Sequence, residues 1–134
     1  AILREAPIDV ALIGIGENGH IAFNDPPANF DTKEAYITVT LDERCRKQQM
    51  GEGWFATIDD VPTHAISMTV YQMMQSRVVL SIVPGLRKAE AIKKTLEAEE
   101  VTNLVPATKL REHANWMLFL DANSASMVDP AKLA

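Results

Sequence analysis

Apolar residues run together in some parts of the chain and alternate with polar residues in others, and both patterns predict strands. The run at residues 78–83 is rich in β-branched residues and is typical of a central strand in a parallel sheet. Residues 9–13 form a second run that predicts a buried strand. The alternation at residues 36–41 indicates a strand with one buried face. Two more strands are predicted at residues 65–69 and 116–120.

Helical patterns separate most of these strands. Asp42 is a suitable N-cap for a helix that runs to about residue 50. Residues 86–99 place apolar side chains on one helix face, and shorter helices are predicted near residues 70–75 and at 106–112. Because strands alternate with helices, the sequence predicts a single α/β domain, with a mostly parallel sheet flanked by helices and joined by right-handed crossovers.

A polar, glycine-rich loop follows the first predicted strand. Its sequence, residues 14–27, is GIGENGHIAFNDPP, with three glycines at the spacing G-x-G-x-x-G: Gly14, Gly16 and Gly19. This spacing opens the dinucleotide-binding fingerprint, and Asp42 lies about where a ribose-binding acid is expected, so a nucleotide site stays as one alternative. However, proline stops a helix, and the Asp-Pro-Pro sequence soon after His20 leaves no room for the long helix of that fold. The preferred interpretation is an active-site loop at the carboxyl end of a strand.

His20 and Asp25 are the first candidates for chemistry in this loop. An imidazole can act as an acid or a base near neutral pH, and Asp25 is placed to hold the ring. Glu17, Asn18 and Asn24 add ionisable and amide groups that packing alone explains poorly. The alternative role for His20 is to tie the loop together. A His-Asp metal pair is conceivable, but a catalytic zinc needs about three protein ligands, so we expect no metal.

Lys88 is the candidate for anion binding. It lies in the first turn of the helix that follows the strand at residues 78–83, behind a Pro-Gly turn. Its ammonium and the free backbone amides of the helix N-terminus can together hold a phosphate. Arg87 is adjacent, so one of these two side chains is expected to be solvated.

Composition and charge narrow the class of protein. The 134 residues are 47% hydrophobic and 23% charged, which is ordinary for one domain, and the net charge of -5 disfavours nucleic acid and anionic membranes as partners. No apolar stretch approaches the roughly 20 residues of a membrane span, and the pattern of the first residues predicts no leader sequence. The single cysteine, Cys45, indicates a reducing compartment, so we expect a cytoplasmic protein. Although its basic neighbours favour a lowered pKa, Cys45 is interpreted as a small apolar residue of a helix.

The loop resembles a known signature. Residues 14–27 are similar to that of the glucosamine-6-phosphate deaminase (isomerase) family, G-I/V-G-x-D/N-G-H-I/L-A-F-N-E/D-P. The similarity continues through CRKQQMGEGWF at residues 45–55, AISMTV at 65–70 and the lysine-containing turn at 84–89, and so covers nearly the whole chain. Related 6-phosphogluconolactonases share the Gly-His pair but usually continue differently. The resemblance implies a Rossmann-like sheet and catalysis without a metal or an organic cofactor.

The family reaction belongs to amino sugar metabolism and converts glucosamine 6-phosphate and water to fructose 6-phosphate and ammonia. The resemblance implies that His20 protonates the ring oxygen and opens the pyranose while Asp25 holds the imidazole. It also implies that Lys88 binds the phosphate. The partner would therefore be a small sugar phosphate, and homo-oligomerisation stays open.

Two positions depart from the best-known members. Asn18 stands where they have an aspartate that supports the histidine, so the imidazolium is expected to be less stabilised unless Glu17 contributes. Gln49 falls near one of their phosphate-binding arginines.

The resemblance begins in the middle of the family pattern. The upstream phosphate loop and the aspartate that abstracts the C2 proton have no counterpart here, and the sequence starts without methionine and enters a core strand within ten residues. We therefore expect residues 1–134 to be a fragment, the C-terminal part of a longer hydrolase or isomerase, inactive by itself. The alternatives are a non-catalytic sugar-phosphate-binding module and a related sugar-phosphate lactonase or isomerase.

Overall fold

The computed structural model describes residues 2–133, and these contain five strands: β1 Val10–Leu12, β2 Tyr36–Thr40, β3 His64–Met68, β4 Val78–Val83 and β5 Trp116–Leu120. The α-helices are α1 Ile2–Glu5, α2 Glu43–Gly51, α3 Val70–Met74 and α4 Ala89–Glu97. Short 3-10 helices are η1 Ile58–Asp60, η2 Leu86–Lys88, η3 Pro106–Glu112 and η4 Pro130–Lys132. The five predicted strands are confirmed, while the helix predicted at residues 86–99 is divided into η2 and α4. None of the helices in this described part is long and apolar enough for a membrane crossing.

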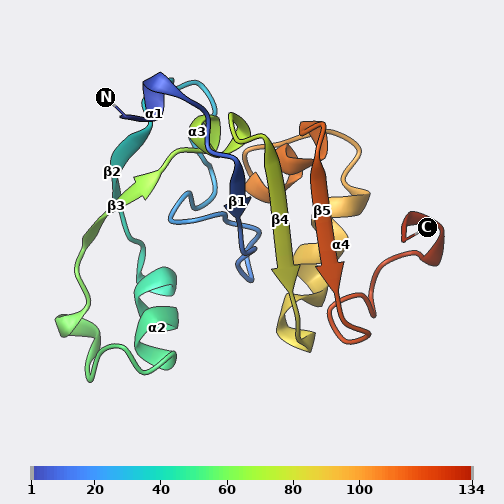
Figure 1. The fold of residues 1–134 in the computed structure, drawn as a ribbon. Helices are drawn as coiled ribbons and strands as arrows, with labels where there is room; N and C mark the ends of the chain where they lie inside the picture. Colours follow the sequence, from blue (N-terminus) through green and yellow to red (C-terminus); the bar gives the residue numbers. More distant parts are fainter. Residues whose placement is uncertain (1, 134) are drawn as a thin grey trace.

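β1, β4 and β5 form a parallel sheet in the order β1-β4-β5 (Figure 1). β4 is the central strand, as its apolar run predicts. It pairs in parallel with both neighbours, with Val10 opposite Val78 and Val79 opposite Trp116. Because the strands are parallel, their carboxyl ends lie at one edge of the sheet, where β1 leads into the loop of residues 14–27.

β2 and β3 form a separate antiparallel pair, with Tyr36 opposite Met68 and Thr40 opposite His64. Figure 1 shows this pair to the left of the parallel sheet, with α2 below it. The α/β class with a parallel sheet is confirmed, but these two strands lie outside that sheet. The alternating burial of β2 explains the difference, because antiparallel pairs can leave one face in water.

Asp42 caps α2 as predicted, since its Oδ1 accepts a hydrogen bond from Cys45 N at 2.7 Å. This carboxylate therefore has a structural task, which removes the support that Asp42 gave to a nucleotide site. Arg46 ties α2 to the segment after it by donating to the carbonyl oxygens of Ile58 at 2.6 Å and Val61 at 3.1 Å.

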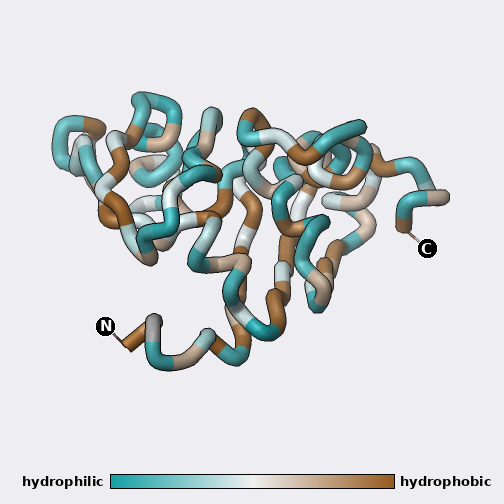
Figure 2. Tube along the Cα trace, turned by 90° about the horizontal axis from the view of Figure 1, so that it is seen from above, coloured by the Kyte–Doolittle hydropathy of each residue, from teal (hydrophilic) through white to brown (hydrophobic). Residues whose placement is uncertain are grey.

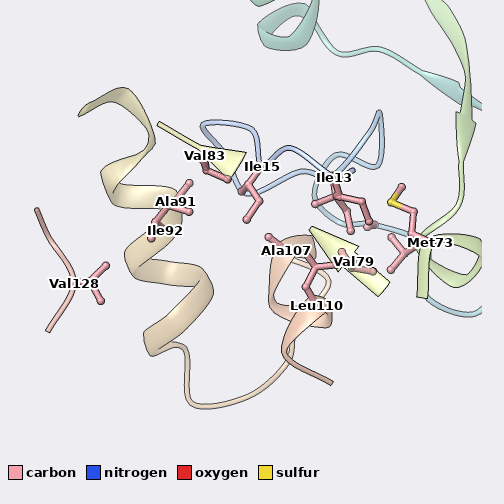
Figure 3. Close-up of a cluster of buried hydrophobic side chains, with 13 residues drawn as sticks. Ile13, Ile15, Met73, Val79, Val83, Ala91, Ile92, Ala107, Leu110 and Val128 are labelled. Carbon is pink, nitrogen blue, oxygen red and sulfur yellow. The ribbon is translucent and has the colours of Figure 1, made fainter. Parts of the chain in front are cut away.

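The core lies on one face of the parallel sheet, against α4 and η3. Figure 3 shows Ala107 and Leu110 of η3 beside Val79 of β4, and Ala91 and Ile92 of α4 toward Val83 at the other end of the same strand. Ile92 and Leu110 are fully buried, which contributes about 2 kcal/mol each relative to an exposed side chain.

The opposite face of the sheet is apolar and uncovered. Figure 1 shows no helix in front of β4 and β5 on the side turned to the viewer, whereas α4 lies behind them. Large apolar side chains on this face are exposed: Val10 51%, Leu12 75%, Ile82 64%, Met117 47% and Phe119 53%. Seen from above, the two termini lie at opposite ends of the molecule (Figure 2).

Candidate functional site

The His20 ring is held from one side by two neighbouring side chains. Its Nδ1 lies 2.6 Å from Asn18 Oδ1 and 3.3 Å from Asp25 Oδ1. Asn18 Oδ1 also accepts from the His20 backbone N–H, and Asn18 Nδ2 donates to Asp25 Oδ1 at 3.0 Å. Since both partners of Nδ1 are oxygen acceptors, Nδ1 carries a proton and Nε2 is the ring nitrogen left for a ligand.

The Asp25 carboxylate is matched to this arrangement. Burial by itself raises its pKa, but the hydrogen bonds from His20 and Asn18 outweigh burial, so the pKa of Asp25 lies below its ordinary value. Burial and the negative charge of Asp25 together raise the pKa of the Cys45 thiol to about 11. Cys45 is buried and stays a thiol at neutral pH, as expected for a small apolar residue, and its basic neighbours do not activate it.

Two glycines allow the loop to take this shape. An added Cβ at Gly16 would lie closer than 3.0 Å to three atoms of the His20 ring, so the ring rests directly on the backbone of residue 16. Gly19 has a φ of +83°, in the region that favours glycine, and an added Cβ there would lie 2.8 Å from Cγ1 of Val105. The loop therefore needs glycine at both positions to seat the imidazole.

Asn24 fastens the loop to β3. Its side chain is 3% exposed, and its Nδ2 donates to the carbonyl oxygens of Ile21 and Met68, both at 2.8 Å. Ser67 Oγ accepts from the Phe23 backbone N–H at 3.1 Å. As the sequence indicates, no helix follows His20. The segment is instead joined to the antiparallel pair.

Lys88 reaches the same loop from the carboxyl end of β4. Its Nζ donates to the Ile15 carbonyl oxygen at 2.9 Å, and its side chain is half-buried. Arg87 is the solvated neighbour, with its side chain 88% exposed and its Nε 3.8 Å from Glu17 Oε1. Glu17 thus faces Arg87, and within residues 2–133 it takes no part in the hydrogen bonds that join His20, Asn18 and Asp25.

A cavity of about 470 Å³ brings most of these groups together. Its lining residues come from the loop, from β3, from α2 and its C-cap, and from η2: Gly14, Ile15, Gly16, His20, Ala22, Phe23, Gln48, Gln49, Glu52, Ile66, Ser67, Met68 and Lys88. Residues of α2 and β3 form one wall of this cavity, and the sequence did not predict that these two elements line the site. The only signal for this wall was the resemblance at residues 45–55 and 65–70, and Gln49, noted there as a departure, does face the cavity.

The other two histidines lie outside this cavity lining. His113 Nε2 lies 2.7 Å from the Ser76 carbonyl oxygen, and His113 Nδ1 accepts from the Asn115 N–H, which is a structural role. His64 is exposed on β3. In the described part of the chain, no three His, Cys, Asp or Glu side chains are grouped so that they could hold a metal ion.

Known proteins are similar in sequence to this chain over nearly all of its length. Residues 1–119 match the family described as glucosamine-6-phosphate isomerases/6-phosphogluconolactonase. A glucosamine-6-phosphate deaminase of Exiguobacterium sibiricum is 41% identical over 133 residues, which are 98% of this chain and 51% of that protein. Its counterpart in Streptococcus equi subsp. zooepidemicus is 38% identical over 128 residues, 96% of this chain and 53% of that protein.

Solved structures of the same family are also similar to this chain. A monomeric glucosamine-6-phosphate deaminase of the NagB superfamily is 37% identical, with a TM-score of 0.79 over 89% of this chain and 47% of that one. The 6-phosphogluconolactonase of Trypanosoma brucei is 20% identical, with a TM-score of 0.67 over 94% of this chain and 46% of that one, which is a likeness of fold. The resemblance seen in the loop is confirmed, and the chain spans about half the length of the curated relatives it matches.

Proposed function

The chain belongs to the glucosamine-6-phosphate isomerase/6-phosphogluconolactonase family, and from this premise we propose that it is the C-terminal part of a glucosamine-6-phosphate deaminase. The complete protein would convert glucosamine 6-phosphate and water to fructose 6-phosphate and ammonia. The observation that carries the proposal is the His20 ring, fixed through Nδ1 by Asn18 and Asp25 and exposed to a cavity that Lys88 also lines.

His20 is proposed to open the sugar ring. In the imidazolium form, Nε2 donates its proton to the ring oxygen of the closed sugar while the bond from that oxygen to C1 breaks. The C1 hydroxyl loses its proton to solvent and becomes the aldehyde carbonyl. Asp25 supports the positive charge on the ring, and Asn18 keeps the imidazole in register by accepting from Nδ1.

Asn18 supports this role in a different way from an aspartate. Its Nδ2 donates to Asp25 while its Oδ1 accepts from His20, so one amide connects the ring and the carboxylate without adding a second negative charge. Asp25 is then the single carboxylate within ion-pair distance of the ring among residues 2–133.

Lys88 is proposed to bind the substrate phosphate. Its ammonium is anchored by the Ile15 carbonyl oxygen, which fixes one of its three donors and leaves two for a ligand in the cavity. Gln49 contributes a neutral amide to the same cavity, where the best-known members are expected to have an arginine nearby. We therefore expect Lys88 to supply most of the phosphate affinity that this chain provides.

Isomerisation requires a base that removes the C2 proton of the sugar. As the resemblance implies, we assign this base to the upstream half of the complete protein. The isolated chain is thus expected to be inactive. The reaction uses no cofactor in this proposal, and the protein is assigned to the cytoplasm.

Substitutions in the complete protein test these roles. His20→Gln should slow turnover of the closed-ring sugar by about 10²-fold or more while inorganic phosphate still inhibits with little change. Lys88→Ala should mainly raise KM for the sugar phosphate and weaken inhibition by phosphate. The matched controls are His64→Gln on exposed β3 and Arg87→Ala beside Lys88. Equal losses of kcat and phosphate binding in both test variants would contradict the assignments.

A sugar-phosphate-binding module without turnover is the second candidate, because the chain spans only about half of its relatives. The coding sequence upstream of residue 1 discriminates the two. An upstream segment with a Ser/Thr-Gly-rich loop and an aspartate supports the deaminase. An initiator methionine directly before residue 1, with no gene for the other half, supports the module.

A further inference from the structure

The uncovered face of the parallel sheet is continuous and contains only apolar side chains. The register of the sheet makes its members neighbours: Val10 lies beside Val78, Leu12 beside Leu80, Leu80 beside Met117, and Ile82 beside Phe119. A sheet face that remains in water normally carries polar side chains, and parallel sheets are normally covered on both faces. A face composed of apolar side chains is expected to be covered by other parts of a protein. In this structure, however, five of the side chains on the face are about half exposed or more.

The β1 edge of the same sheet is also open. In the described part of the chain β1 pairs with β4 alone, so its other edge presents backbone groups without a strand partner. Ile13 N donates to the Leu80 carbonyl oxygen, which turns residue 13 toward β4 and, by the alternation of a strand, the amide of Leu12 toward the free edge. An apolar hollow of about 390 Å³ lies along β1, lined by residues such as Ile8, Leu12 and Met73.

We propose that this face and the β1 edge together bind a polypeptide segment that supplies one parallel strand beside β1 and an apolar helix face over Ile82 and Phe119. The segment corresponds to the half of the curated relatives that this chain does not match, since the chain covers 51% of the Exiguobacterium sibiricum protein. This inference rests on one part of the proposed function, the assignment of this chain to the C-terminal part of a longer protein. It does not depend on the deaminase activity.

A second copy of the chain fits this surface less well. Two copies stacked face to face would cover both apolar faces but leave both β1 edges open. Two copies joined at their β1 edges would leave both faces bare, and a two-fold axis would pair the strands antiparallel. A segment that contains both a strand and a helix covers the edge and the face at once, as crossover units do in parallel sheets.

The test is co-expression of the 134-residue chain with the unmatched segment of the Exiguobacterium sibiricum deaminase, carrying an affinity tag. We expect a one-to-one complex, identified by its mass in solution. Ile82→Lys and Phe119→Lys, made separately, should each weaken the complex about tenfold or more, because each places an ammonium in an apolar interface. Leu104→Lys is the matched control, since Leu104 is 63% exposed and lies on a loop outside the sheet. All three replaced side chains are exposed, and circular dichroism verifies that each variant folds.

Hydrogen exchange supplies a second measurement. The amide of Leu12 should exchange at least about tenfold more slowly in the complex than in the chain alone, while the amide of Leu104 should not change. Absence of a complex, a complex as strong for Ile82→Lys as for Leu104→Lys, or a homodimer that the Ile82 and Phe119 variants dissolve would each overturn the proposal. A complex that forms as expected but has no deaminase activity would overturn the proposed function and leave this inference standing.

Discussion

Replacing Gly16 by alanine tests whether the His20 ring depends on the absence of a side chain at residue 16. An added Cβ would lie closer than 3.0 Å to Cε1, Nδ1 and Nε2 of the ring. The ring has to move by about 1.5 Å to reach ordinary van der Waals contact. The neighbouring backbone cannot give way easily, because Gly16 N–H donates to the His20 carbonyl oxygen and Gly16 O accepts from Gly19 N–H.

The movement has two costs that can be estimated. Overpacking at a tight position costs about 1–3 kcal/mol, and separating Nδ1 from its oxygen partners costs about 1 kcal/mol more for each lost hydrogen bond. Depending on whether one or both of these bonds are lost, we expect Gly16→Ala to lower the free energy of unfolding by about 2–5 kcal/mol. If His20 is the proposed acid of the complete protein, misplacing its ring by about 1 Å or more should slow turnover by about 10²-fold or more.

Gly14→Ala is the control from the same loop, because an added Cβ there has nothing within 4 Å. Urea unfolding measures the free energy of both variants. Nitrogen NMR of the His20 side chain reports whether neutral His20 still carries its proton on Nδ1. The reasoning is refuted if Gly16→Ala keeps that proton position and is no less stable than Gly14→Ala.

Three further predictions concern the same loop and its support. Asn24→Ala should lower the free energy of unfolding by about 2–3 kcal/mol, because it removes a buried amide with several hydrogen-bond partners. The control Asn123→Ala, at an exposed residue, should change it by less than about 0.5 kcal/mol. Urea unfolding measures both variants, and equal values would contradict the role of Asn24. The pKa of Asp25 is lowered in the folded chain, so ionised Asp25 stabilises the fold above its ordinary pKa of 3.8, and this stabilisation is lost as pH falls through the lowered value. Asp25→Asn should therefore flatten the acid limb of stability against pH, and an unchanged slope would show that Asp25 does not carry it. The pKa of Cys45 near 11 predicts that a thiol reagent at pH 8 modifies the native chain far more slowly than the urea-unfolded chain, and equal rates would contradict the assignment.

Much of the fold can be predicted because local signals agree with it. Asp42 caps α2, and the continuous apolar run of β4 does occupy the centre of a parallel sheet. The pairing of β2 with β3 could not be predicted, because alternation tells which face of a strand is buried but does not identify its partner. The helix expected from residue 86 starts with a 3-10 turn, after Gly85 with its φ of +97°.

The sequence predicted two parts of the candidate site: the residues that are close together in the loop, and Lys88, from its place in the first turn after β4. His20, Asn18 and Asp25 lie within one loop, and the structure joins them by hydrogen bonds. Glu17 is adjacent to Asn18 in sequence but turns toward Arg87, since consecutive residues of a turn point in different directions. The wall formed by α2 and β3 depends on long-range packing, which no local pattern specifies.

The parallel register of β1 has a consequence for how the chain folds. Val10 and Val78 are neighbours in the sheet although they are 68 positions apart in the chain, whereas Thr40 and His64 of the antiparallel pair are 24 apart. Closing the longer loop costs more chain entropy before any contact compensates for it, so the antiparallel pair is expected to form first. During synthesis, β1 then has to wait without its partner until more than half of this chain has been made. Its apolar residues are therefore expected to stay without their native cover throughout that interval.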